Sequence, residues 1–404
     1  MYNAVAIPKM TFAADVWYTP IYRIEGRQNR SGSVGITRRL TSIQCLATTA
    51  ITGALQSMAT DVLDLHANVL PVKLLLHHIC HRVAVRLATL PASHPLALVF
   101  HMQAKQFIKS HHLPLHELAF IFDISPDSIE TLSPARSLPR QQSRFEIAPD
   151  STAAESIEWD ISNTADIWIY TDGSGLDSQA GAAAVLYRGD QAPKVLRLHL
   201  GTLLEHMTFE AEAVGLVLEA YLLSEEGQVS SATISTDSQT ALSSLDIRKL
   251  RLGQQYIDEF LHLTRLIWHQ ATQDDYHLTL AWVKGHNRVD GNARADEEAR
   301  DAAKGSSSPE MELPESLRTG LLPMSISALQ QHHNQGLQAL WKEQWEDSPC
   351  YLRLNKIDPS LPSNRFQKLV SKLGRSQASL LIQLHTGHAP LNEYLHRIMK
   401  ADSP

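Results

Sequence analysis

The amino-acid sequence predicts an α/β domain with a mixed five-stranded sheet, placed between two mainly helical regions. Three observations support this fold class. Residues 166–304 alternate between strand-like and helix-like segments, residues 40–99 are dense in Ala, Leu, Ile and His at helical spacing, and the tract after residue 320 shows helical spacing again. The central order is a three-stranded meander followed by helix–strand units, which predicts strands of both directions in one sheet.

The central elements follow from local patterns. Short runs rich in β-branched and aromatic residues predict strands, and longer runs with apolar residues three or four positions apart predict helices. The expected strands are 166–172, 181–188, 194–200, 231–237 and 277–284. The expected helices are at about 208–223, 238–246, 255–271 and 291–304.

Pro-rich and Ser-rich breaks predict how the chain divides into domains. Its 404 residues are enough for two or three domains. The expected parts are a helical region at 1–150, a linker at 151–165, the α/β domain at 166–305, a linker at 306–320 and a helical tail at 321–404.

Cysteine usage and hydropathy limit the cellular setting. The cysteines are Cys45, Cys80 and Cys350, an odd number far apart, which argues against a disulfide framework and a Cys-based zinc site. The amino terminus has no basic segment followed by an apolar core, and no run of about eighteen uncharged apolar residues occurs. We therefore expect an intracellular protein that is neither secreted nor inserted in a membrane, in the nucleus or the cytoplasm.

Charge is distributed unevenly along the chain. The net charge is −7, so there is no global basic signature of nucleic-acid binding. Residues 1–150 carry 14 Lys+Arg against 10 Asp+Glu, whereas residues 166–304 carry 12 against 21. We expect the basic excess of the first region to add affinity for nucleic acid.

Two predicted strands end in an acidic residue. The stretch IWIYTDGSG places Asp172 at the end of its strand, and ATISTDSQTAL places Asp237 at the end of another. A lone Asp before glycine is also typical of an Asx-turn, in which the side chain bonds the backbone two residues on. Two such strand ends favour a shared site, because loops at the ends of neighbouring strands meet in space.

The helix TFEAEAVGLVLEAYLL supplies a third acid. Glu210 and Glu212 are two positions apart, about 200° around a helix, so they cannot both face one site. Each of them flanks the expected buried stripe, and periodicity does not choose between them.

A fourth acid and a histidine follow the last strand. Asp296 lies early in the helix after Gly291-Asn292, where an acid often serves only the helix dipole. His286 lies in the loop before that helix. A loop histidine is usually only solvated, but between acidic elements it can transfer protons near neutral pH.

These motifs together resemble type I ribonuclease H over residues 166–305. The resemblance rests on TDGS at Asp172, the T-x-x-A-E helix at Glu212, TDSQ at Asp237 and W-V-K-G-H…G-N-x-x-A-D ending at Asp296. It implies a ribonuclease H-like sheet with helices on both faces, two Mg²⁺ ions bound by these four acids, with Mn²⁺ as a substitute, and an RNA/DNA hybrid as substrate.

The resemblance also assigns further residues. It selects Glu212 over Glu210, because its pattern places the acid just after T-F-E-A. It implies that His286 aids proton transfer and product release. It implies that Ser174, Thr208 and Gln239 contact the backbone of the hybrid.

The flanking regions resemble segments of fungal polyproteins from retrotransposons without long terminal repeats. The segment VWYTP…LPVKLLLHHICHRVAVRLATLPASHPL is similar to the part that follows their polymerase domain, and QASLLIQLHTGHAPLNEYLHRI is similar to their tail. Two departures stand out: Ala293 replaces a frequent Glu, and no Tyr-x-Asp-Asp occurs, so polymerase activity is not expected.

The function that this sequence predicts is metal-dependent endonucleolytic cleavage of the RNA strand in RNA/DNA hybrids. A catalytically silent mobile-element fragment that only binds nucleic acid or a partner is the alternative from another class. A resolvase or exonuclease of the same fold is a third possibility, against which the K-G-H-N loop and the GNARAD segment argue. The sequence identifies no protein partner.

Overall fold

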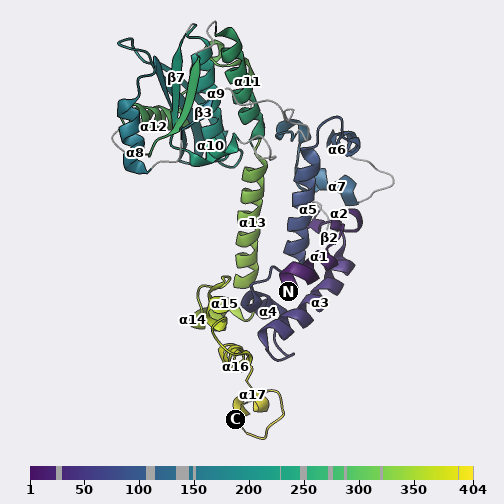
Figure 1. Cartoon of the computed structure of the whole chain (residues 1–404). Helices are drawn as coiled ribbons and strands as arrows, with labels where there is room; N and C mark the ends of the chain where they lie inside the picture. The colour runs from purple at the N-terminus through teal and green to yellow at the C-terminus, as the bar shows by residue number, and fades with distance from the viewer. Residues whose placement is uncertain are drawn as a thin grey trace. The chain divides into compact units, whose positions relative to one another are not determined.

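The computed structural model describes most of the chain (Figure 1). The described residues are 1–23, 30–105, 114–132, 145–148, 152–227, 229–245, 253–271, 276–285, 289–318, 322–389 and 391–403. The chain forms two compact units. One comprises residues 88–98 and 125–332, and the other comprises residues 1–87, 99–124 and 333–404. We call them the sheet unit and the helical unit.

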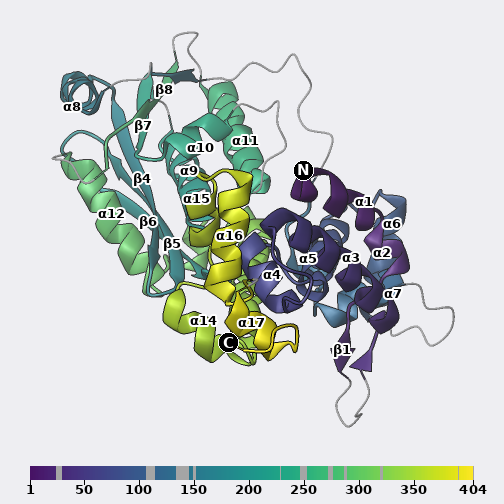
Figure 2. The same ribbon diagram turned by 90° about the horizontal axis from the view of Figure 1, so that it is seen from below.

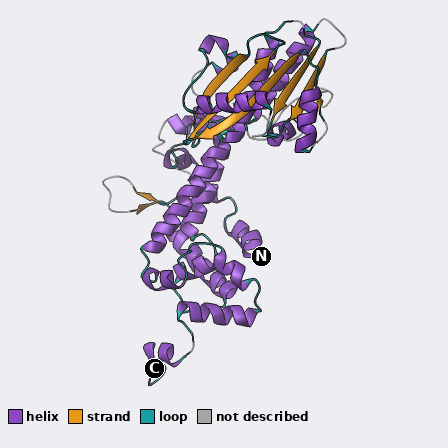
Figure 3. Cartoon of the chain, turned by 90° about the vertical axis from the view of Figure 1, so that its left-hand side faces the viewer, coloured by secondary structure: helices purple, strands orange, loops and turns teal. Residues whose placement is uncertain are grey.

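The sheet unit is built on a mixed sheet, drawn in orange at the top of Figure 3. Its six strands lie in the order β3-β8-β7-β4-β5-β6. The strands are β3 (Glu146–Ile147), β4 (Ile167–Leu176), β5 (Gln179–Tyr187), β6 (Lys194–Thr202), β7 (Ser231–Thr236) and β8 (His277–Trp282). β4, β5 and β6 form an antiparallel meander, whereas β4, β7, β8 and β3 run parallel to one another. The predicted mixed sheet is confirmed, with one strand more than the five expected.

The additional strand, β3, lies in the range expected to be helical. Its two residues pair with Thr279 and Leu280 of β8. Two residues are too few to show an alternation of apolar and polar side chains. Pairing with the edge of an existing sheet, rather than strand propensity, decides their conformation.

Helices cover both faces of the sheet, as predicted (Figure 2). α9 (Thr208–Ser224), α10 (Gln239–Ser244) and α11 (Gln254–Gln270) lie on one face, and α12 (Asp290–Ala303) lies on the other. Side chains of β4 alternate between these two layers. Ile167 and Ile169 join the core formed with α9 and α11, whereas Tyr170 packs against Val289 and Ala295 at α12.

A helix, α8 (Ala153–Ser162), occupies most of the segment expected to be a linker. Thr152 and Glu155 form its capping box: the backbone N–H of Glu155 donates to the Thr152 hydroxyl, and Glu155 Oε2 accepts from the Thr152 N–H at 2.7 Å. The hydroxyl of Tyr170 donates to Asp160 Oδ1 at 2.9 Å, which joins α8 to the sheet. The capping pattern T-x-x-E was present in the sequence and was missed.

Segments outside residues 166–305 are also joined to the sheet unit. Ile129 forms an isolated parallel bridge with Met324. The buried carboxylate of Glu130 accepts from the backbone N–H of Gly253 at 2.8 Å and from that of Ile326 at 2.9 Å. Gly253 precedes α11, and Ile326 begins α13 (Ile326–Glu346). One carboxylate therefore satisfies donors at the N-termini of two helices, where negative charge is favoured.

The helical unit contains most of the remaining elements. They are a π-helical turn (Tyr2–Ala6), α1 (Ile7–Met10), α2 (Ala14–Trp17), β1 (Tyr22–Arg23), β2 (Arg30–Ser31), α3 (Val34–Thr52), α4 (Thr60–Ala67), α5 (Val72–Ala88), α6 (Pro95–Lys105), α7 (Pro114–Ile121), α14 (Tyr351–Ile357), α15 (Arg365–Val370), α16 (Arg375–Thr386) and α17 (Asn392–Arg397). Ala88, the first four residues of α6 and the first seven of α13 belong to the sheet unit.

The two ends of the chain share one core in the helical unit. Leu63 of α4 packs in the same buried cluster as Trp345 of α13 and Ile382 of α16. A hydrogen bond of 2.9 Å joins His66 Nε2 to His385 Nδ1 across the same elements. Residues more than 300 positions apart thus stabilise each other.

Over the residues that the structure describes, no helix is both long enough and apolar enough to span a membrane.

Candidate active site

Asp172 lies where β4 separates from β7. The parallel pairing of these strands ends at Thr171 opposite Thr236. Asp172 and Asp237 are the next residues along the chain, so the register brings them to the same end of the paired region. β4 itself continues to Leu176, paired with β5, which corrects the expectation that the strand ends at Asp172. No turn begins there, so the Asx-turn interpretation is wrong.

Glu212 approaches the site through a close contact between α9 and β4. A Cβ added to Gly173 would lie 2.3 Å from the backbone nitrogen of Glu212, so this approach requires glycine. The hydroxyl of Ser238, the residue that follows Asp237, donates to Glu212 Oε2 and also accepts from the N–H of Ala241 at the start of α10. Ser238 therefore caps a helix and orients Glu212.

Glu210 has other partners than Glu212. It is 1% exposed, and its Oε2 accepts from the backbone N–H of Met207 at 2.9 Å, which caps the start of α9. His206 Nδ1 lies 3.6 Å from the same oxygen. The structure thus separates the two glutamates that periodicity left equivalent.

Asp237 is held by backbone and ring contacts. The indole N–H of Trp282, the last residue of β8, donates to the Asp237 carbonyl at 3.0 Å. A Cβ added to Gly285 would lie 2.4 Å from Asp237 Oδ2, so the loop after β8 passes directly against this carboxylate. Neither contact could be read from sequence spacing.

Asp296 reaches the site from the opposite face of the sheet. It lies in the second turn of α12, not the first, so the helix-dipole interpretation fits Asp290 better. Its Oδ2 pairs with Arg300 at 2.7 Å.

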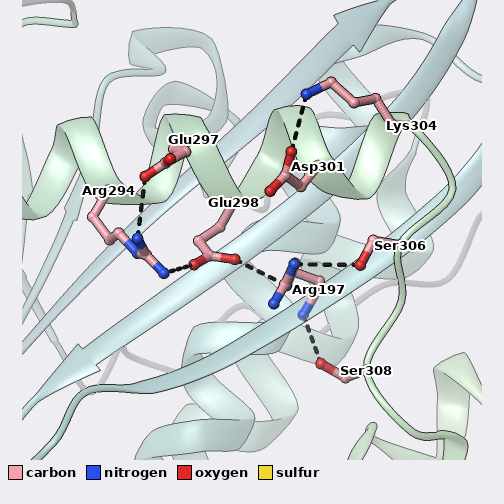
Figure 4. A network of polar contacts seen from close by, with 8 residues as sticks. All are labelled: Arg197, Arg294, Glu297, Glu298, Asp301, Lys304, Ser306 and Ser308. Atoms are coloured by element: carbon pink, nitrogen blue, oxygen red, sulfur yellow. Dashed lines mark hydrogen bonds and ion pairs between the residues drawn. The ribbon is translucent and has the colours of Figure 1, made fainter.

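An ion network fixes α12 against the sheet (Figure 4). The buried carboxylate of Glu298 pairs with Arg294 of the same helix and with Arg197 of β6, the latter at 2.9 Å. Because Glu298 is only 2% exposed, its charge is costly unless both partners remain in place. The network sets the position of α12 and hence of Asp296.

The electrostatics of Asp172 show that the four acids are neighbours. Burial, the charges of Asp237 and Asp296, and that of Glu212 raise the pKa of Asp172 to about 7, against a hydrogen bond from the Gly173 N–H that lowers it. Burial raises the pKa of Glu212 and Asp237 adds to this, whereas the bond from Ser238 opposes it. Charged carboxylates repel one another here, and a cation would relieve the repulsion.

The donor set suits a hard divalent cation. All four side chains offer carboxylate oxygens, which Mg²⁺ prefers. Among the described residues, no three acidic, histidine or cysteine side chains lie close enough together to hold one ion. Mg²⁺ commonly takes one or two carboxylates and retains several waters. The chemistry of these carboxylate donors therefore fits Mg²⁺.

The remaining predicted residues are placed as follows. Ser174 lies on β4 opposite Gly181 and is half-buried. Thr208 and Gln239 are exposed first residues of α9 and α10. His286 lies outside the described residues, directly after Gly285. Ser238 and Trp282 were not predicted as site residues, although Ser at a helix start after an acid was a visible capping signal.

Residues 164–304 match the model of the RNase H family. No curated protein matches the chain.

Solved RNase H structures resemble about a third of the chain. RNase H1 from the archaeon Halobacterium salinarum is 17% identical, with 35% of this chain and 98% of that chain covered and a TM-score of 0.27. The N-terminal RNase H domain of a Mycobacterium tuberculosis protein, fused to maltose-binding protein, is 19% identical, with 35% and 96% covered and a TM-score of 0.26. LC11-RNase H1 in complex with an RNA/DNA hybrid is 18% identical, with 34% and 97% covered and a TM-score of 0.27. Residues 164–304 are thus similar to the RNase H family.

Proposed function

We propose that this protein is a metal-dependent endonuclease that hydrolyses the RNA strand of RNA/DNA hybrids, and that it derives from a retrotransposon. The observation that carries the proposal is the register of β4 and β7, which brings Asp172 and Asp237 together beside Glu212 and Asp296. The RNase H match over 164–304 supports the same class of substrate.

In this proposal Asp172, Glu212, Asp237 and Asp296 hold two Mg²⁺ ions, which Mn²⁺ can replace. Bound in this way, the ions supply charge stabilisation at the attacking and leaving oxygens of the scissile phosphate. Ser238 keeps Glu212 oriented, and Trp282 and Gly285 fix Asp237. His286 aids proton transfer and product release.

Selectivity for the RNA strand requires recognition of its 2′-hydroxyls, since that group distinguishes RNA from DNA. Ser174, Thr208 and Gln239 are the residues that we propose for contacts to the hybrid. The exposure of Thr208 and Gln239 at helix starts is consistent with this role, because backbone N–H groups at a helix start also favour phosphate.

The test is cleavage of a labelled RNA/DNA hybrid by the purified full chain, with Mg²⁺ or EDTA. We expect Mg²⁺-dependent cleavage of the RNA strand only, and its loss in Asp172→Asn and in Asp237→Asn. Asp177→Asn is the matched control, because Asp177 is exposed in the turn between β4 and β5, with a left-handed backbone conformation that Asn tolerates. Near-wild-type cleavage by either site variant would disprove the assignment of the site.

A second candidate function is nucleic-acid binding without catalysis. The ion pair between Asp296 and Arg300 favours it, because that carboxylate is already matched by a cation. The same experiment separates the two: hybrid binding without cleavage by the wild-type chain under any divalent metal supports a silent binding module.

A further inference from the structure

The two units carry opposite formal charges. With histidine counted as neutral, the sheet unit has 16 Lys+Arg against 31 Asp+Glu, a net charge of −15, and the helical unit has 20 against 12, a net charge of +8. The unit with the proposed nuclease site should therefore repel a polyanion, and two divalent ions would cancel only four of its negative charges. Affinity for a nucleic acid must come largely from elsewhere in the chain.

The basic residues of the helical unit are concentrated in one tract near the C-terminus. Between residues 353 and 375 six basic residues face a single acid, Asp358. All six basic side chains are exposed: Arg353, Lys356, Arg365, Lys368, Lys372 and Arg375. No other tract of comparable length in the chain has such an excess.

Three of these side chains form a stripe on α15 and the turn after it. Arg365 and Lys368 follow the spacing i, i+3, which places them on one side of α15 (Figure 2), and Lys372 lies in the turn directly after this helix. We call these three residues the basic stripe. The opposite side of α15 faces the core, because Phe366 is buried and Val370 packs against the same cluster.

The basic stripe is available for an external partner. Neither Lys368 nor Lys372 forms an ion pair with an acid in the described part of the chain. Arg365 influences the buried Asp358, whose pKa is lowered, against the effect of burial, by hydrogen bonds from Ser360 and by the charges of His385 and Arg365. Arg375, by contrast, donates to the carbonyls of Ala50 and Ile51 at the end of α3. Arg375 therefore has a structural role, and the stripe does not.

We propose that the basic stripe binds the phosphate backbone of the hybrid that the sheet unit cleaves. The identity of the ligand rests on the proposed function. Three neighbouring exposed cations, two on α15 and one in the turn after it, can contact the phosphates of a nucleic-acid backbone, and such contacts carry no base information. The binding is therefore independent of sequence, and it weakens steeply as salt concentration rises.

The experiment measures binding without cleavage. Fluorescence anisotropy of a labelled RNA/DNA hybrid is followed for the full chain in EDTA, across a salt series from about 50 to 200 mM. The test variant is Arg365→Gln, Lys368→Gln, Lys372→Gln. The matched control is Lys342→Gln, Arg397→Gln, Lys400→Gln, which removes three exposed basic residues of the same unit outside the stripe.

We expect the stripe variant to bind roughly tenfold more weakly at the low-salt end, with a slope of log affinity against log salt shallower by about 2 to 3, as for three lost phosphate contacts. The control should change neither value appreciably. Equal affinities and slopes for the wild type and the stripe variant would overturn the proposal, and so would an equal loss in the control.

A single variant, Lys372→Glu, distinguishes a loss of binding from a loss of folding. Lys372 lies in an exposed turn, so its substitution should leave the fold intact. It should weaken binding without shifting the melting temperature. Unchanged binding by Lys372→Glu together with a misfolded triple variant would count against the stripe. The assay measures binding in EDTA and does not depend on catalysis. Whether the stripe binds the hybrid and whether the protein cleaves it are therefore tested separately.

Discussion

Gly173 of β4 lies directly against the backbone of Glu212 in α9. A Cβ at residue 173 would be 2.3 Å from the nitrogen of Glu212 and 2.6 Å from the carbonyl carbon of Ala211. The atoms in conflict belong to a helix backbone, which cannot rotate aside as a side chain can. Because Gly173 has no side chain, α9 can pack closely enough on β4 to bring Glu212 near Asp172.

Gly173→Ala should push α9 away from β4. We expect a loss of stability of about 1–3 kcal/mol, typical of overpacking, and a fall in hybrid cleavage of at least tenfold because the carboxylates are misplaced. Thermal unfolding and a cleavage assay measure the two effects. Gly336→Ala is the control, since that helical glycine has open space around it and alanine there should be neutral or slightly stabilising. Wild-type behaviour of Gly173→Ala would show that the contact does not constrain the site.

Glu212→Gln and Glu210→Gln should affect different properties. Glu212→Gln is expected to abolish cleavage with little change in stability, because an amide cannot replace a charged metal ligand. Glu210→Gln should retain most activity but lower the stability by about 1–2 kcal/mol, because the buried cap on the Met207 N–H is weakened. Activity and urea unfolding of both variants, compared side by side, test this. The reverse pattern would mean that Glu210 is the metal ligand.

The stability of the metal-free protein should depend on pH through Asp172. Its pKa is raised from an ordinary value near 3.8 to about 7. As pH rises from about 4 to 7, the unfolded chain gives up this proton while the folded chain retains it, so stability falls across that window. Asp172→Asn lacks the effect. In EDTA its melting temperature should exceed that of the wild type by a few degrees at pH 8, and the difference should shrink toward pH 4.

Melting curves of both proteins at several pH values in EDTA give the measurement. Adding Mg²⁺ at pH 8 should raise the melting temperature of the wild type more than that of Asp172→Asn, since a ligand stabilises the state that binds it. A difference between the two proteins that is constant from pH 4 to pH 8 would contradict the raised pKa.

Glu130 should be essential to the stability of the sheet unit, although it lies outside the RNase H match. Glu130→Leu leaves the N–H groups of Gly253 and Ile326 without their acceptor, which we expect to cost about 2–5 kcal/mol. Glu130→Gln retains one carbonyl acceptor and should cost less. Glu158→Gln, an exposed substitution on α8, is the control for loss of charge. Chemical unfolding of the full chain decides whether the leucine variant is the least stable of the three.

Much of the sheet unit was predictable because its signals are local. Five of the six strands and the four helices of the RNase H region lie within a few residues of their expected positions, and β4 extends furthest beyond its prediction. The capping box of α8 was equally local, and was missed because its segment reads as polar linker. β3 was not predictable, because two residues become a strand only when β8 offers an edge.

By itself, the sequence determined which residues are candidates for the chemistry and in which order they occur: one acid in a strand, one directly after a strand and two on helices, since propensity and capping act within a few residues. Only the tertiary structure decided how these residues meet. The register of β4 with β7 made Asp172 and Asp237 neighbours, the contact at Gly173 and the hydroxyl of Ser238 directed Glu212 rather than Glu210 to them, and Glu130 joined distant segments to α11 and α13. Strand register and the pairing of buried polar groups depend on contacts between residues far apart in the chain, and no local pattern encodes them.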